Sequence, residues 1–183
     1  MSRQRLFVAL PIPDHVRMLG VAARAPAEAV LPALGWTRPE GWHVTLAFLG
    51  EVADDDVPRV GPVVAEVARR HAPIGCHLGA AGRFGDRVLW LGVEDDPVGA
   101  IAALGDEVQG ALAAAELPVR VAPVRPHLTL ARGRSGGVGH DHVAAVAPVT
   151  VGWEVAHLEV VRSHLGDGPA RYETLERLPL AAG

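Results

Sequence analysis

A short motif occurs twice in the chain, once in each half. Residues 42–50 read WHVTLAFLG and residues 126–134 read PHLTLARGR, so His-x-Thr-Leu-Ala is written twice in 183 residues. In a β-strand, residues i and i+2 lie on one face and residue i+1 lies on the other. His43 and Thr45 therefore share a polar face, while their apolar neighbours face a core. The repeat predicts an internal duplication in which each half supplies one such strand.

The second copy of the motif gives His127 and Thr129 the same arrangement. If the halves are related by an approximate two-fold axis, two imidazoles and two hydroxyls converge on one cleft. An imidazole titrates near pH ~6.5, so one ring can accept a proton from water while the other donates one to a leaving oxygen. Threonine hydroxyls suit the oxygens of a phosphate. The residues require one acid and one base and leave open which histidine takes which part.

The two copies differ at one position after the shared residues. Arg132 follows the second motif, whereas Phe48 stands at the matching place in the first. A guanidinium stabilises negative charge that develops on a phosphate. Simple alternation puts Arg132 on the face opposite to His127, so we expect this arginine at a strand end or in a bend. The halves are therefore predicted to be chemically unequal.

The other segments alternate between strand and helix patterns and contain no linker-like stretch, which predicts one α+β body over residues 1–183. Amphipathic helices are expected to begin near Asp14 and to lie within residues 54–73 and 96–117. The expected strands cover residues 5–10, 42–49, 76–93 (a hairpin around Gly85 and Asp86), 126–132, 152–163 and 170–178. A Gly-rich loop is expected over residues 133–142.

The composition excludes several classes of protein. Apolar residues make up 49% of the chain, which argues against disorder, and a net charge of −4 gives no sign of nonspecific nucleic-acid coating. The single cysteine, Cys76, excludes an internal disulfide and a multi-cysteine zinc site, as suits a reducing compartment. Residues 5–12 are better explained as a buried strand than as a signal peptide, and no apolar run approaches the ~20 residues that span a bilayer. We therefore expect a soluble, cytoplasmic protein.

These motifs resemble those of the two-histidine (2H) phosphoesterase superfamily, and most closely the LigT-type RNA 2′,3′-cyclic phosphodiesterases, also called 2′-5′ RNA ligases. The likeness extends from the opening RLFVALPIP through HVTLAFLGEV, RVLWLGV and RPHLTLAR to the closing GPARYETLERL. It implies a bilobal α+β fold in which two antiparallel sheets face a central cleft with helices outside. The segment after Arg132, GRSGGVGHDH, follows no pattern of that family.

The resemblance also implies an activity and a role for each motif residue. The activity is hydrolysis of a 2′,3′-cyclic phosphate at an RNA end, or in a cyclic nucleotide, to a 2′-phosphate without a metal or cofactor. His43 would donate a proton to the leaving 3′ oxygen and His127 would accept one from water. Thr45, Thr129 and Arg132 would hold the phosphate. Further candidates for phosphate, ribose or base contacts are Ser163, Arg171, Tyr172 and Trp90, and a monomer is expected.

Other functions stay open from the sequence. RNA ligation, or cleavage of 2′-5′-linked oligonucleotides, would need the same acid–base pair. A non-catalytic RNA or nucleotide-binding module would keep the cleft but has little need of two titratable imidazoles. A metal-dependent hydrolase could use His140 and His142, although a solvated loop explains that pair better. The polar faces could also simply line a solvated sheet.

Overall fold

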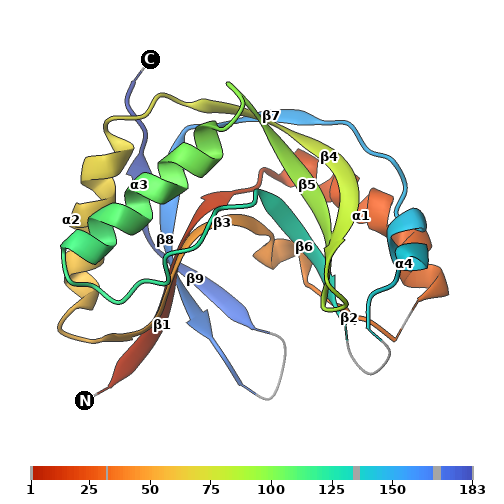
Figure 1. Ribbon diagram of the computed structural model, residues 1–183, viewed down its shortest axis with the longest axis horizontal. Helices are drawn as coiled ribbons and strands as arrows, with labels where there is room; N and C mark the ends of the chain where they lie inside the picture. Colours follow the sequence, from red (N-terminus) through yellow and green to blue (C-terminus); the bar gives the residue numbers. More distant parts are fainter. Residues whose placement is uncertain (1, 32, 134–136, 167–169, 183) are drawn as a thin grey trace.

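The computed structural model describes residues 2–31, 33–133, 137–166 and 170–182, which form two antiparallel sheets with helices around them (Figure 1). The four-stranded sheet has the order β3-β1-β8-β9, with bounds β3 His43–Ala53, β1 Arg3–Pro11, β8 His157–His164 and β9 Arg171–Pro179. The five-stranded sheet has the order β2-β6-β5-β4-β7, with bounds β2 Gly35–Trp36, β6 His127–Arg132, β5 Val88–Asp96, β4 Ile74–Phe84 and β7 Gly152–Val155. The helices are α1 Asp14–Val30, α2 Val57–Ala68, α3 Ala100–Ala114 and the short α4 His140–Ala144, with a 3₁₀ turn, η1, at Pro39–Gly41.

The two sheets repeat one plan, as the duplicated motif predicts. In the first, β1 leads through α1 to β3, and β1 pairs with β3. In the second, β5 leads through α3 to β6, and β5 pairs with β6. The motif strands β3 and β6 therefore occupy equivalent places. The expected α+β fold with two antiparallel sheets and outer helices is confirmed.

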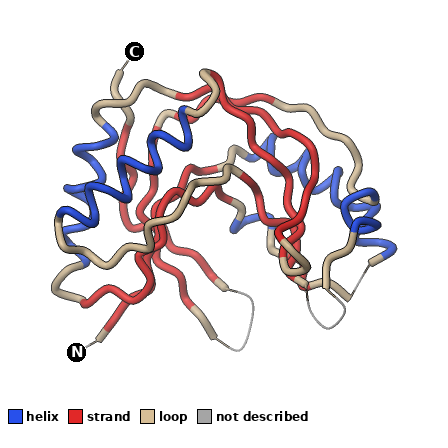
Figure 2. The backbone as a smooth tube through the Cα atoms, viewed as in Figure 1, coloured by secondary structure: helices blue, strands red, loops and turns tan. Residues whose placement is uncertain are grey.

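The helices cross over between the two lobes. Although α3 connects strands of the five-stranded sheet, it packs against β3 and α2, over the four-stranded sheet. Helix α1 connects β1 with β3, yet it lies beside α4 on the outside of the five-stranded sheet (Figures 1 and 2). The backbone N–H of Ala147 donates to the Ala23 carbonyl of α1 at 2.8 Å. Each lobe is completed by a helix from the other half of the duplication, so the lobes are intertwined.

Strand β1 shows how the core and the inner face are separated. Leu6, Val8 and Leu10 alternate into the main core, where burial of each such side chain stabilises the fold by about 1.5–3 kcal/mol. Phe7 and Ala9 point the other way and form a separate small cluster with Val161 of β8. This second cluster lies on the face of the sheet that looks toward the other lobe.

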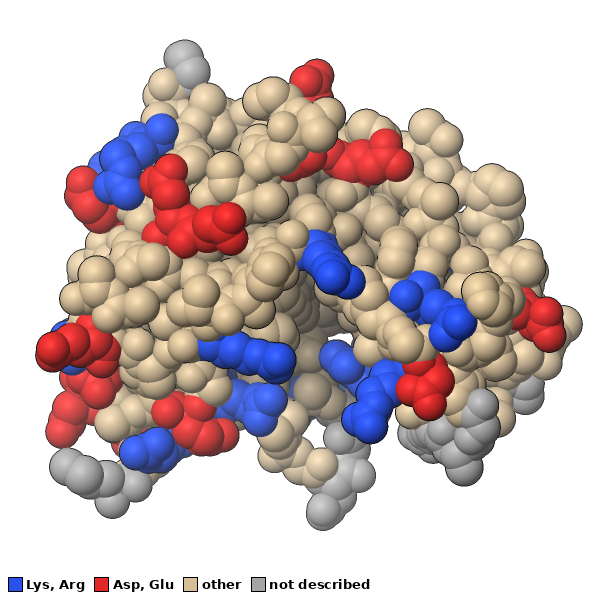
Figure 3. All heavy atoms as spheres, viewed as in Figure 1, with Lys and Arg blue, Asp and Glu red and all other residues tan. Residues whose placement is uncertain are grey.

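A hollow separates the lobes on the molecular surface. Figure 3 shows it at the centre of the molecule, with arginine side chains gathered around it and many carboxylates farther out. The excess of acidic residues over basic ones is therefore not spread evenly over this face. An anion in the hollow is favoured by the nearby positive charge despite the net negative charge of the protein.

One predicted strand is wrong. Residues 152–163 read as a continuous strand, but the structure ends β7 at Val155 and begins β8 at His157. The two pieces belong to different sheets, because β7 pairs with β4 whereas β8 pairs with β1 and β9. The buried positions shift by one residue at the break, from Trp153 and Val155 in β7 to Leu158 and Val160 in β8, and the prediction of one continuous strand overlooked this shift.

Three other boundaries also differ from expectation. Strand β3 continues through Gly50, which adopts a φ of 68°, to Ala53. The segment 133–142, predicted as a loop, contains the start of α4, and residues 134–136 lie outside the described residues. The two-residue strand β2 was not predicted because it is too short to show a period.

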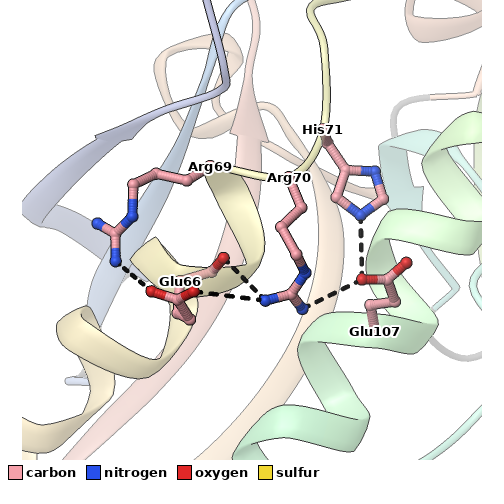
Figure 4. A network of polar contacts seen from close by, with 5 residues as sticks. All are labelled: Glu66, Arg69, Arg70, His71 and Glu107. Carbon is pink, nitrogen blue, oxygen red and sulfur yellow. Dashed lines mark hydrogen bonds and ion pairs between the residues drawn. The ribbon is translucent and has the colours of Figure 1, made fainter.

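A link of exposed charges joins α2 to α3 (Figure 4). Glu66 pairs with Arg69 and Arg70, and Glu107 of α3 accepts from Arg70 at 3.3 Å and lies 3.3 Å from the His71 ring nitrogen. Because these side chains are solvated, each pair contributes at most about 1 kcal/mol. The buried side chain that links α3 to the motif strand is Gln109, whose amide donates to the Leu46 carbonyl at 2.8 Å and accepts from the Ala122 N–H at 2.8 Å.

We predict that Gln109→Leu lowers the free energy of unfolding by about 1–3 kcal/mol, because it leaves the Leu46 carbonyl and the Ala122 N–H buried without partners. Arg70→Ala, on the exposed link, is the control and should cost less than about 1 kcal/mol. Urea denaturation followed by circular dichroism measures both. Equal losses for the two variants would contradict this view of what holds α3 to β3.

Candidate active site

Both motif strands contain a β-bulge at the same place. In β3 the pairing with β1 shifts between Thr45 and Ala47, so Leu46 is an extra residue. In β6 the pairing with β5 shifts between Thr129 and Ala131, so Leu130 is the extra residue. A bulge of one residue reverses the alternation of everything that follows it in the strand.

The bulges decide where the residues after each motif point. The burial patterns of His43–Phe48 and His127–Arg132 are identical, with two buried residues in succession and then an exposed one. Arg132 therefore lies on the same face as His127 and Thr129, although simple alternation excludes it. Phe48 is turned in the same way toward the face of His43 and Thr45. Arg132 was expected at a strand end or in a bend, and the bulge at Leu130 supplies that bend.

The backbone carbonyl of each extra residue accepts a hydrogen bond from a side chain outside its strand. The Leu46 carbonyl accepts from the buried Gln109. The Leu130 carbonyl accepts from the backbone N–H of Thr37 at 2.9 Å, and the Thr37 hydroxyl lies 2.9 Å from it and 2.7 Å from the Thr129 carbonyl. That hydroxyl also accepts from the indole N–H of Trp42 at 2.8 Å. Sequence reasoning missed Thr37 and Gln109, since neither lies in a motif.

The two imidazoles have the same backbone anchor. Nδ1 of His43 lies 2.7 Å from the Gly41 carbonyl, and Nδ1 of His127 lies 2.5 Å from the Arg125 carbonyl. A carbonyl only accepts, so Nδ1 carries the proton in both rings and Nε2 is left for chemistry. Each anchor is the backbone carbonyl two positions before its histidine, so the anchoring is equivalent in the two lobes.

Aromatic rings pack against both histidines. Phe7 stacks on His43 at 4.5 Å between ring centroids, and Tyr172 meets His43 edge-on at 5.3 Å. Phe84 meets His127 edge-on at 4.8 Å, with Trp90 at 6.4 Å. These contacts withdraw the rings from water without offering them a counter-charge.

Burial therefore shifts both histidines toward their neutral form. It lowers the pKa of His43 to about 4, against the opposing effect of the Gly41 carbonyl. Burial also lowers the pKa of His127, with the Arg125 carbonyl again opposing. The charges of His127 and Arg132 lower the pKa of His43 further. Strands β3 and β6 also contact each other, so the two motifs lie close together.

Of the four further candidates from the sequence, Tyr172 and Trp90 lie beside motif residues. Tyr172 lies against His43, and Trp90 is paired with Thr129 on the neighbouring strand. Ser163 is paired with Tyr172 across β8 and β9 and shares its face. Arg171 precedes Tyr172 in β9 and so lies on the opposite face.

Among the described residues, no group of three or more histidine, cysteine, aspartate or glutamate side chains is arranged to hold a metal ion. His140 Nε2 lies 3.1 Å from the Arg83 guanidinium, and His142 Nδ1 accepts from the Gly139 N–H at 2.8 Å. These two side chains are therefore engaged with other groups. Burial raises the pKa of the Cys76 thiol to about 12, which keeps it protonated and unreactive. No helix in the described ranges is both long and apolar enough to cross a bilayer.

Comparison with known proteins identifies the family. A family model described as the 2′-5′ RNA ligase superfamily matches residues 24–167, which include both motifs. The chain belongs to this superfamily. The resemblance read from the paired motifs is thereby confirmed.

Individual members of the superfamily match over nearly the whole chain. The RNA 2′,3′-cyclic phosphodiesterase of Escherichia coli is 30% identical, with 97% of both chains covered. The protein of the same name from Geobacillus stearothermophilus is 27% identical over 98% of this chain, which spans 58% of that relative's length. The crystal structure of E. coli LigT complexed with 3′-AMP has a TM-score of 0.79 and 25% identity, covering 99% of this chain and all of the other.

We predict that nuclear magnetic resonance titration finds His43 neutral, with its proton on Nδ1, at pH 7 and protonating near pH 4. Phe7→Ala should raise this pKa toward the ordinary ~6.5, because it admits water to the ring and favours the charged form. His77, an exposed residue, gives an internal reference in the same spectra. A pKa for His43 at or above 6.5 in the unaltered protein would contradict the burial described above.

Proposed function

We propose that the chain hydrolyses 2′,3′-cyclic phosphates at RNA ends or in cyclic nucleotides to 2′-phosphates, with the two histidines as general acid and base. The observation that carries this proposal is the pair of equivalent bulged strands, each with an Nδ1-anchored imidazole and a threonine on one face, to which the second strand adds Arg132. The names of the relatives support it, as do the structures of E. coli LigT complexed with 3′-AMP, NADP+ and ATP.

The proposed reaction is an in-line displacement at phosphorus. Nε2 of His127 accepts a proton from water as the water oxygen bonds to phosphorus. The bond from phosphorus to the 3′ oxygen breaks, and Nε2–H of His43 donates its proton to that oxygen. The product is a 2′-phosphate with a free 3′-hydroxyl. Loss of the proton from His127 and uptake of one by His43 restore the starting state.

Electrostatics favour the uptake of a proton in the site once the substrate is bound. Both rings are biased toward the neutral form when no anion is present, because burial lowers both pKa values. A bound phosphodiester carries a negative charge, which raises the pKa of a neighbouring imidazole. Substrate binding therefore favours an imidazolium in the site, and we assign that proton to His43 by its place in the first motif. Arg132 and the hydroxyls of Thr45 and Thr129 would offset the charge that grows on the phosphate oxygens.

The proposal treats residues 1–183 as one catalytic domain, because each lobe supplies half of the site. It includes no metal or cofactor, since every step is assigned to a side chain of this protein. The reverse reaction, which would join a 5′-hydroxyl end to the cyclic phosphate, uses the same groups. Product analysis with acceptor RNA present distinguishes the two directions.

We predict that the protein hydrolyses adenosine 2′,3′-cyclic phosphate equally well with and without EDTA, and that His43→Ala and His127→Ala each lower kcat/KM about 100-fold or more. The reason is that positioned acid–base groups contribute about 10²–10⁴-fold to such reactions. His77→Ala, which removes an exposed imidazole paired with Glu94, is the matched control and should have no effect. Full activity in both motif variants, or loss of activity in EDTA, would refute the mechanism.

A further inference from the structure

Each motif strand is entered by a segment that first runs beside the other motif strand. We call residues 35–42, which lead into β3, the first strap, and residues 118–126, which lead into β6, the second strap. The first strap begins as β2, whose two residues pair with the last two residues of β6. In the second strap, the N–H of Arg120 donates to the Phe48 carbonyl of β3 at 2.8 Å. Figure 1 shows the second strap, in teal, crossing from the end of α3 to β6.

One side chain links the first strap to the bulge of β6. The Thr37 hydroxyl lies 2.7 Å from the Thr129 carbonyl and 2.9 Å from the Leu130 carbonyl. The same hydroxyl accepts from the indole N–H of Trp42 at 2.8 Å, and Trp42 is the residue directly before His43. The Thr37 side chain therefore connects the bulge of the second motif to the residue next to the histidine of the first.

Helix α1 packs against the first strap and holds its backbone. The guanidinium of Arg24 lies over the rings of both Trp36 and Trp42, at 5.6 Å and 5.5 Å from their centroids. It also donates to the Thr37 carbonyl at 2.6 Å. Arg24 and Trp42 are both buried. A buried cation of α1 thus fixes the strap at the residue whose hydroxyl makes the link.

The second strap is linked to β3 in an equivalent way. The buried amide of Gln109 donates to the Leu46 carbonyl, at the bulge of the first motif, and accepts from the N–H of Ala122 in the second strap, both at 2.8 Å. Ala122 precedes His127 in that strap. Each bulge is therefore bonded to a side chain that also holds the segment leading to the histidine of the opposite motif.

We propose that Thr37 and Gln109 are positioning residues that set the separation of the two imidazoles, because each links one bulge to the segment before the opposite histidine. An in-line displacement needs the acid and the base on opposite sides of one phosphorus at a fixed spacing, and a misplacement of about 1 Å can lower a rate about 100-fold. Neither residue is among those assigned to the phosphate, so the effect falls on kcat more than on KM. This inference rests on the proposed phosphodiesterase function.

The test removes the Thr37 hydroxyl and keeps the shape of the side chain. With adenosine 2′,3′-cyclic phosphate as substrate, Thr37→Val should lower kcat about 10- to 100-fold, while KM changes less than about threefold. Thr37→Ser keeps the hydroxyl and should retain most of kcat. Trp42→Phe removes only the indole donor and should lower kcat about tenfold. Thr150→Val, at an exposed threonine outside both straps, is the matched control and should have no effect.

A double-mutant cycle with His43→Ala separates positioning from a general structural role. When one imidazole is missing, the separation no longer matters, so Thr37→Val should lower kcat of the His43→Ala variant less than about twofold. Gln109→Leu should give the same pattern. An equal fold-loss in both backgrounds, or no loss in either, would overturn the proposal. Circular dichroism checks that each variant is folded at the assay temperature, and if Thr37→Val is not, Trp42→Phe takes its place in the cycle.

A failure of the proposed function is distinguishable from a failure of this inference. If the unaltered protein hydrolysed no cyclic phosphate, the proposed function would fail, and calorimetry with inorganic phosphate then tests the straps. Thr37→Val should weaken phosphate binding about fivefold in the unaltered protein but less than about twofold in the Thr45→Val background, because the remaining ligands, Thr129 and Arg132, both lie on β6. Equal weakening in both backgrounds, or none, refutes the proposal.

Discussion

The arrangement of the site depends on one extra residue in each motif strand. Without the bulges at Leu46 and Leu130, alternation would send Phe48 and Arg132 away from the face that carries the histidines. A bulge leaves a ladder group without its regular partner, and a buried carbonyl without a hydrogen bond is costly. Gln109 satisfies one of these carbonyls and Thr37 the other. The polar face of each lobe is thus built by hydrogen bonds from segments outside the motif.

Burial is the second constraint, and it acts on the same strands. The rings that pack against His43 and His127 keep water away, which disfavours the charged imidazolium. Arg132 adds a positive charge to a site that already disfavours it, and so lowers the pKa of both histidines. The empty site therefore favours an anion over a cation. Under the proposed function, a bound phosphodiester meets this preference, and its negative charge raises the pKa of a neighbouring imidazole.

Much of this plan could be predicted from the sequence. The repeat of His-x-Thr-Leu-Ala was enough for the paired strands, the shared polar face and the unequal position after the motif. The positions of Thr37 and Gln109 were not predictable, because their role depends on contacts between distant segments. The partners of β7 and β8 lie in different sheets, which depends on distant segments, although the shift in alternation at Ala156 marks the break between them. Tyr172 was a candidate, but its contact with His43 depends on β9 lying in the sheet of β1.

In the proposed reaction the symmetric scaffold acts asymmetrically, because His43 serves the leaving oxygen. Replacing the bridging 3′ oxygen of adenosine 2′,3′-cyclic phosphate by sulfur tests this directly, because a thiolate departs without a proton. With this substrate, His43→Ala should lose less than about tenfold in kcat/KM, whereas His127→Ala should still lose about 100-fold or more. Rescue of His127→Ala instead of His43→Ala would contradict the assigned roles.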